Sequence, residues 1–475
     1  MYMAIDQTCC KDVFGRMKSC ACSGSAMVEG RLMLDKNEGV WSKEKAVRNI
    51  NILRTLIGCF FFLEEFAKSH QRGYLLAHTL FPNTMDNSMA LDYPISKFEA
   101  DNNLDNQNVV LKYRIAADIA NDALIRVLSK VAAGVSVHDL CQYGDDIIQA
   151  RGIAFPTSVC LNNTVQYHSP LADEPEILMP GDLVKIELGV HLDGYIATAA
   201  HTTVLNPDPQ KPIMGPQADA ICAAHYAAET ALRLAKPGVK ASTITRAIIE
   251  TCAIFRCVPI EGTGSHRLKR FVLRATRMIP STFDDGLTPQ QRDEADFTLE
   301  QGEAYAIDVV VAAGDGKTKE SLYKSTIFQR DVNQSYQLKM KSSRIAFNEI
   351  SERFGVFPFS IRSLRSAPSR LGVSELVSRG LLTPYATLRT PRTSEPVAQF
   401  KCTLLLTPAG ALRTTLALPL PYVRSTYRIV EGTEAAKVLG QPEIKMIKEP
   451  KLPDVPRDIV FGRKPVGVEV SMDLS

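Results

Sequence analysis

The sequence predicts an α+β domain that is built from a duplicated unit of two helices and two strands. Two sequence patterns each occur twice. In the first pattern, a Leu-rich run ends in Gly-Val and is followed by a second apolar-periodic helix, at residues 123–137 and again at 231–241. In the second pattern, a Gly and an acidic residue precede a strand, at residues 179–189 and again at 300–310. The two patterns follow each other in the same order both times, which indicates two halves with the same local structure.

The helix that opens the first half begins near Val109. Ile115, Ile119, Ala123 and Val127 recur at helical spacing before Gly134 ends the pattern. Such a stripe is typical of an amphipathic helix that packs on a sheet.

An acidic residue stands at the same place in each of the two strands. Glu187 is the sixth residue after Gly181, and Asp308 is the sixth residue after Gly302. Alternate strand residues share a face, so equivalent registers place both carboxylates on the same side and facing a shared centre. Two inward carboxylates suggest a metal site or an acid/base pair, while chance similarity of two strand starts is the alternative.

Composition restricts the class of protein. A chain of 475 residues with 45% hydrophobic and 23% charged residues can bury a large core. The net charge of +3 is too small to identify a nucleic-acid binder, so local patches must decide that question. The scattered cysteines and the lack of a secretory signal favour a reducing compartment. The most apolar run, residues 56–63, is too short for a membrane span.

Three segments are expected along the chain. Residues 1–88 form an extension without sustained periodicity, which is either poorly ordered or not part of the native product; its cysteines fit no standard zinc spacing. Residues 89–438 form the main domain, with an insertion at about 344–392. Residues 439–475 are Pro-rich with mixed charges, which predicts a disordered tail.

Several motifs resemble type 2 methionine aminopeptidases, and more closely the proliferation-associated, ErbB-binding and curved-DNA-binding branch of that fold. They are found at residues 152–171, 181–204, 259–269, 304–309, 336–344 and 397–400. The resemblance implies the pita-bread fold, a curved antiparallel sheet from two pseudo-symmetric halves flanked by helices, with a small helical insertion.

In active members of that family, five side chains hold two divalent ions. The resemblance places these ligand positions at Glu187, Thr198, His266, Asp308 and Lys401, and only His266 keeps its residue type. The substrate-side histidine falls on Tyr167, with His168 one place later. The metal site is therefore expected to be degenerate.

The charges at these positions oppose a pair of metal ions. Two divalent ions need several carboxylates around them, whereas the five positions together carry a formal charge of minus one. We expect Lys401 to act as a built-in cation that pairs with Glu187 and Asp308. The alternatives are ordinary buried polar groups, or one residual ion held by Glu187, His266 and Asp308 with His168 or His201.

Two basic segments are candidates for phosphate contacts. In residues 266–279, arginines recur at steps of three and four opposite an apolar face, which predicts a helix with a guanidinium row. In the insertion, further arginines precede a helix-like run and a turn at Pro384. A solvated face without a ligand is the alternative for residues 266–279. The candidate RNA-binding residues are Arg267, Lys269, Arg270, Arg274, Arg277, Arg362, Arg365 and Arg370.

The resemblance implies a binding protein that needs no cofactor. Relatives in this branch bind the large ribosomal subunit near the tunnel exit, and structured RNA, precursor ribosomes or bent DNA. We therefore expect a non-catalytic factor in ribosome biogenesis, translation or growth control, with DNA and other proteins as further candidate partners. A cytoplasmic location with a nuclear or nucleolar pool fits these partners, although the mixed-charge tail lacks the lysine run of many relatives. The alternative is a divergent metal-dependent aminopeptidase that acts on nascent N-termini.

Overall fold

The computed structural model describes residues 101–149, 151–173, 176–284 and 286–446, together with two short strands near the N-terminus. The chain divides into two compact units, Met1–Asp92 and Tyr93–Ser475. In the first unit, β1 (Met27–Val28) pairs antiparallel with β2 (Arg31–Leu32). The rest of the predicted extension, 1–88, lies outside the described residues.

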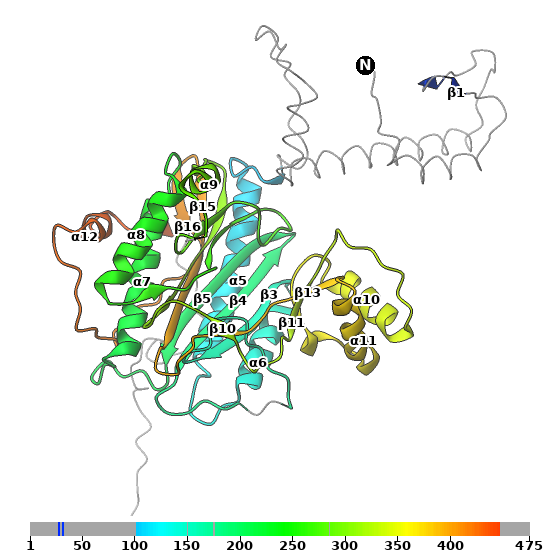
Figure 1. Cartoon of the computed structure of the whole chain (residues 1–475), viewed down its shortest axis with the longest axis horizontal. Helices are drawn as coiled ribbons and strands as arrows, with labels where there is room; N and C mark the ends of the chain where they lie inside the picture. The colour runs from blue at the N-terminus through cyan, green and yellow to red at the C-terminus, as the bar shows by residue number, and fades with distance from the viewer. Residues whose placement is uncertain are drawn as a thin grey trace, which may run out of the picture. The chain divides into compact units, whose positions relative to one another are not determined.

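A ten-stranded sheet forms the centre of the second unit (Figure 1). Its strands are β3 (Ile153–Leu161), β4 (Leu183–Leu192), β5 (Tyr195–Val204), β6 (Val258–Pro259), β7 (Gly264–Leu268), β8 (Met278–Pro280), β9 (Ala304–Ala312), β15 (Val397–Thr407), β16 (Gly410–Arg413) and β17 (Lys445–Met446). The main path runs β3-β4-β5-β15-β9-β7-β8, and every pair along it is antiparallel. The two halves meet where β5 pairs with β15, at Ala200 and Lys401.

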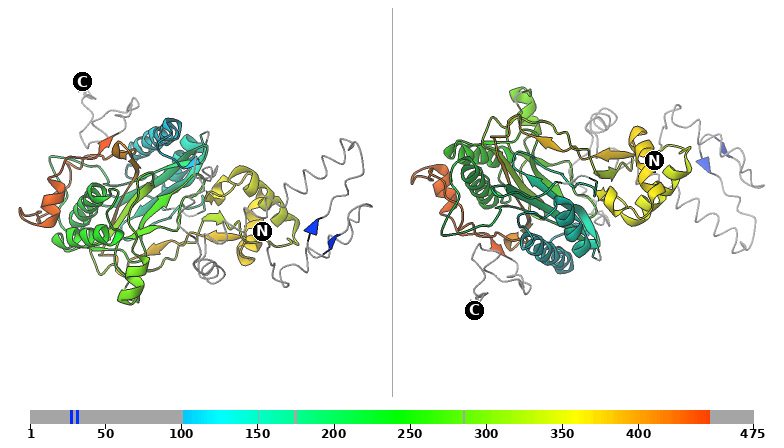
Figure 2. Two further views of the ribbon diagram at one scale, coloured as in Figure 1. Left: turned by 90° about the horizontal axis from the view of Figure 1, so that it is seen from above. Right: turned by 90° about the horizontal axis from the view of Figure 1, so that it is seen from below.

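Each half contributes a pair of helices, as the repeats predict. The first pair is α5 (Gln107–Leu128) and α6 (Val137–Gln149), and the second is α7 (Pro216–Leu234) and α8 (Ala241–Ile254). A glycine with positive φ separates the helices of each pair, Gly134 in the first half and Gly238 in the second. The two pairs form separate groups, cyan and green in Figure 2. The predicted duplication is confirmed.

The helices cover one face of the sheet and leave the other face for the site. Ile186 and Leu188 of β4 lie in one apolar core with residues of α5 and α6. Ile307 and Val309 of β9 lie in a second core with residues of α7 and α8. Because side chains alternate along a strand, the residues between them point to the opposite face.

The insertion is a small helical layer with its own core, yellow in Figure 1. It contains α10 (Lys341–Arg353), the 3-10 helix η1 (Ile361–Ser363) and α11 (Ala367–Ser378). A three-stranded sheet lies beside them, in the order β12 (Phe359–Ser360), β11 (Ile327–Arg330), β13 (Leu382–Pro384). The predicted helical insertion is confirmed, and its core extends back to Phe328 of β11.

Four short elements complete the described chain: α9 (Pro289–Ala295), β10 (Lys319–Glu320), β14 (Leu388–Arg389) and α12 (Glu434–Leu439). The predicted disordered tail is wrong at Lys445–Met446, because these residues satisfy the backbone of β16 by forming β17 beside it. Residues 447–475 of that prediction lie outside the described residues. No helix in the described ranges is long and apolar enough to cross a membrane.

Candidate functional site

A pocket opens on the face of the sheet that the helices leave free. Its free volume of about 60 Å³ is large enough for a few water molecules. Glu187 of β4, Asp308 of β9 and Lys401 of β15 line it, so the two halves place their acidic residues around one centre. The predicted convergence of Glu187 and Asp308 is confirmed.

Lys401 lies between the two carboxylates. Its Nζ donates to Oε1 of Glu187 and lies 2.8 Å from Oδ2 of Asp308. All three side chains are nearly buried, with exposed fractions of 11%, 4% and 7% in the order Lys401, Glu187, Asp308. Burial alone would lower the pKa of Lys401, but the charges of Asp308 and Glu187 outweigh it and hold this pKa well above its ordinary value. The predicted ion pairs are confirmed.

Two amides complete the coordination of these carboxylates. Nε2 of Gln399 donates to Oδ1 of Asp308 over 2.9 Å and to Oε2 of Glu187 over 3.3 Å. Nε2 of Gln166 donates to Oδ2 of Asp308 over 3.3 Å. The carboxylate oxygens are thus occupied by N–H donors of this chain, as buried charges require.

Arg274 brings a second cation to the pocket. Its guanidinium lies over the ring of Tyr385 at 4.8 Å and that of Tyr167 at 5.5 Å, and donates to the Tyr167 hydroxyl over 2.5 Å. Its charge also interacts with Glu187 and Asp308. The formal charge of minus one over the five family positions does not include Arg274. Two carboxylates and two cations leave the pocket without net formal charge.

His266 and Thr198 occupy the two remaining family positions, and both line the pocket. His266 lines the pocket from β7, with a buried Nδ1 that has no hydrogen-bond partner. Burial and the nearby charges of Arg274 and Lys401 lower the pKa of His266 to about 4, so the ring is neutral at pH 7. The backbone N–H of Thr198 donates to Oγ1 of Thr403 over 2.9 Å.

The two substrate-side candidates point in different directions. Tyr167 lines the pocket, and burial raises its pKa to about 12, so its hydroxyl stays protonated. His168 lies outside the pocket lining, and its Nε2 is 2.6 Å from Oε2 of Glu176. His201 packs its ring against Phe400 and also stays outside the lining.

The donor set does not fit the two metal ions that the fold implies. The ammonium group of Lys401 occupies the position between the two carboxylates, and Arg274 adds a second positive charge close by. A divalent ion there would meet strong repulsion in a partly buried site. Within the described ranges, no three His, Cys, Asp or Glu side chains are grouped so that they could hold a metal.

The predicted helix at residues 266–279 is wrong. The segment forms β7, a turn and β8, with Lys269 bridged to Val272 and with Phe271 at a φ of 61°, which a helix does not allow. Buried Leu268 and Ile279 anchor the two strands. Arg267 lies in β7, whereas Arg270, Arg274 and Arg277 lie in the segment between the two strands, so their three-and-four spacing reflects a hairpin and not one face of a helix.

Most arginines of this hairpin have acidic partners within the domain. Arg267 and Arg277 both bind the buried carboxylate of Glu303, at 2.9 and 2.6 Å. Arg270 binds Asp101 at 2.8 Å and Asp193 at 2.6 Å. These ion pairs occupy the guanidinium groups that the sequence predicts to contact phosphate oxygens.

The insertion arginines divide into a buried one and exposed ones. Arg362 is 4% exposed and binds Oδ2 of Asp145 on α6 over 2.6 Å. Arg370 is exposed and donates to the carbonyl oxygen of Leu364. Arg365 is exposed, and no hydrogen bond or ion pair engages its side chain within the described residues.

Sequence reasoning missed the pocket roles of Gln399, Gln166 and Arg274. Gln399 could have been found, since it precedes Lys401 by two residues on the same strand and therefore shares its face. Gln166 and Arg274 lie outside regular strands, so no periodic signal marks them.

Comparison with known proteins agrees with this geometry. Residues 112–322 match the model of metallopeptidase family M24. Proliferation-associated protein A of Dictyostelium discoideum is 38% identical over 73% of this chain and 91% of its own length. ERBB-3 BINDING PROTEIN 1 of Solanum tuberosum is 41% identical over 67% and 84%.

Two further matches extend these similarities. The curved DNA-binding protein of Schizosaccharomyces pombe is 33% identical over 75% of this chain and 96% of its own length. The solved structure of a thermophilic Arx1 is 26% identical, with a TM-score of 0.65, over 72% of this chain and all of that one. The ten-stranded sheet and paired helices are those of the pita-bread fold, and the chain belongs to metallopeptidase family M24, among the relatives named proliferation-associated, ErbB-3-binding and curved-DNA-binding proteins.

Proposed function

We propose that this protein is a non-catalytic member of family M24 that binds the large ribosomal subunit near the tunnel exit, together with structured RNA. The observation that carries the first part is Lys401, whose ammonium group stands between Glu187 and Asp308 where the family holds its metals. A pocket whose charges are already balanced has no need of divalent ions. The cytoplasm, with a nuclear or nucleolar pool, is the location that suits these partners.

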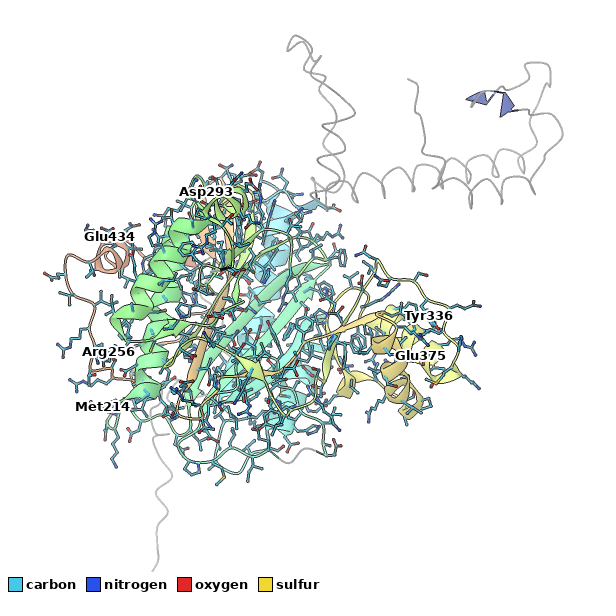
Figure 3. All side chains as sticks on the ribbon, in the orientation of Figure 1. Met214, Arg256, Asp293, Tyr336, Glu375 and Glu434 are labelled. Atoms are coloured by element: carbon cyan, nitrogen blue, oxygen red, sulfur yellow. The ribbon has the colours of Figure 1, made fainter. Side chains whose placement is uncertain are left out.

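The insertion supports the binding role. Its helices and the segment before them expose basic side chains that no acid neutralises among the described residues: Lys339, Lys341, Arg344 and Arg365. The nearby Ser343 hydroxyl and the N–H groups of Met340 and Lys339 lower the pKa of Glu375, which is labelled in Figure 3. Free lysine and arginine side chains on a rigid layer suit phosphate oxygens. The name of the curved DNA-binding relative is consistent with a nucleic-acid partner, and DNA is the second candidate.

The first prediction concerns metal and catalysis. Protein purified without a chelator should carry well under one divalent ion per chain and should release no methionine from Met-Gly peptides, because Lys401 and Arg274 already balance both carboxylates. Metal analysis and a peptide assay with added cobalt or manganese provide the measurement. Near-stoichiometric metal with turnover would contradict the proposal and favour the divergent aminopeptidase.

The second prediction concerns the insertion. Changing Lys341, Arg344 and Arg365 together to Glu should weaken binding to large ribosomal subunits by on the order of 100-fold at moderate salt, since three phosphate contacts and their counterion release are lost. Stability should change little, because all three side chains are exposed and unpaired. Co-sedimentation across a salt series, with thermal unfolding in parallel, gives both quantities.

A matched control makes the same change of charge elsewhere. Lys211, Arg246 and Arg428 are exposed and lie outside the insertion, and their joint change to Glu should leave co-sedimentation close to wild type. Equal loss in both triple variants would indicate a general charge effect. Full binding by the insertion variant would show that the contact surface lies outside the insertion.

A further inference from the structure

Two basic residues face each other on a ribbon apart from the insertion helices. β10 (Lys319–Glu320) pairs antiparallel with β14 (Leu388–Arg389), and Lys319 is the direct partner of Arg389. Leu388 packs into the apolar cluster around Val165. The adjacent Arg389 therefore points to the other side of the ribbon, where Lys319 also lies.

This pair is unfavourable in the free protein. Directly opposed residues of an antiparallel pair have Cβ atoms only ~5 Å apart, and like charges at that spacing destabilise the ribbon. Neither side chain has a hydrogen bond or an ion pair within the described residues. Nε of Arg389 is buried without any acceptor, and an unsatisfied buried donor adds to the cost.

An oxyanion between the two side chains would remove the repulsion. It would accept from the guanidinium of Arg389 and from Nζ of Lys319, and its charge would turn repulsion into attraction. The neighbouring Glu320 cannot do this, because it pairs with Leu388 on the opposite face of the ribbon.

We propose that Lys319 and Arg389 form a phosphate clamp that binds the backbone of RNA. The proposal rests on the ribosome- and RNA-binding function given above and adds a second contact outside the insertion helices. Exposed Lys317 and Lys324 stand on either side of Lys319 along the chain. A row of cations matches the repeated phosphates of a nucleic acid better than a single phosphate group of a protein.

The clamp predicts that stability and binding change in opposite directions. In Lys319→Glu, the introduced carboxylate pairs with Arg389, so the full-length protein without RNA should unfold at a temperature equal to or above that of wild type. Its affinity for a labelled RNA hairpin with a stem of ~16 base pairs should fall, and the slope of log K against log salt should become shallower by about one. Lys211→Glu, an exposed control with the same change of charge, should move neither quantity.

Inorganic phosphate tests the clamp without RNA. It should raise the unfolding temperature of wild type and of Lys211→Glu, and should have little effect on Lys319→Glu, because binding to the folded state alone stabilises it. A loss of stability in Lys319→Glu without phosphate would show that the pair is not repulsive, which overturns the proposal.

The other outcomes separate the clamp from the function beneath it. If wild type binds the hairpin and Lys319→Glu binds it with the same affinity and salt slope, the clamp is wrong while RNA binding stands. If Lys319→Glu abolishes the rise in unfolding temperature with phosphate but leaves RNA affinity unchanged, the assignment to RNA is wrong. The ligand of the clamp is then a phosphorylated protein. If wild type binds neither hairpin nor ribosomes, the proposed function fails and the clamp with it.

Discussion

Lys401→Ala is expected to lower the free energy of unfolding by about 3–5 kcal/mol, the usual cost of removing one partner from a buried ion pair. The side chain holds Glu187 and Asp308 together, and all three are nearly buried. Without the ammonium group, Gln399 and Gln166 still donate to these carboxylates, and Arg274 is the one cation left in the pocket lining to oppose their mutual repulsion. Denaturant unfolding of the full-length protein measures the loss.

Two further variants identify the cause of that loss. Lys401→Met combined with Glu187→Gln removes one cation and one carboxylate, leaves Asp308 opposite the charge of Arg274, and should recover most of the lost stability, since neutral groups of similar size replace a buried ion pair at little cost. Lys437→Ala removes a lysine from an exposed pair with Glu434 and should change stability by at most about 1 kcal/mol. An unchanged unfolding curve for Lys401→Ala would show that the triad contributes nothing to the fold.

The architecture was accessible from sequence because the repeats carry it. Gly134 and Gly238 lie at equivalent places between the paired helices of the two halves, and a glycine and an acid precede both the strand of Glu187 and the strand of Asp308. Alternation along a strand then predicts one shared pocket. The pairing of β5 with β15 that closes this pocket brings together residues about 200 positions apart, and only the family resemblance indicates it.

The arginine hairpin shows why the rest was not accessible. A spacing of three and four residues is also produced by two short strands and a turn, and local pattern does not distinguish these cases. The turn depends on Phe271, whose backbone N–H donates to the carbonyl oxygen of Gly194. The Phe271 ring packs so closely on Gly194 that a Cβ atom at this position would lie only 2.7 Å from the ring. Such a contact between distant segments decides the fold of the hairpin and leaves no signal in its own sequence.

The second large effect is expected at Arg362, which the sequence groups with exposed arginines. Arg362→Ala should lower the free energy of unfolding by about 3–5 kcal/mol, because it leaves Asp145 buried without its cation. The guanidinium also donates to Oγ of Ser169 over 2.8 Å and to the Pro170 carbonyl over 3.2 Å. It therefore ties the insertion to α6 and to the segment after β3.

The neighbouring Arg365 provides the matched comparison. Its side chain is exposed and unpaired, so Arg365→Ala should leave stability within about half a kcal/mol of wild type while weakening ribosome binding. Arg362→Gln with Asp145→Asn keeps hydrogen-bonding groups at both positions without charge, and it should recover stability lost in Arg362→Ala. If Arg362→Ala unfolds like wild type but fails to co-sediment with ribosomes, then Arg362 contacts RNA after all, and the buried pair with Asp145 does not hold the insertion in place.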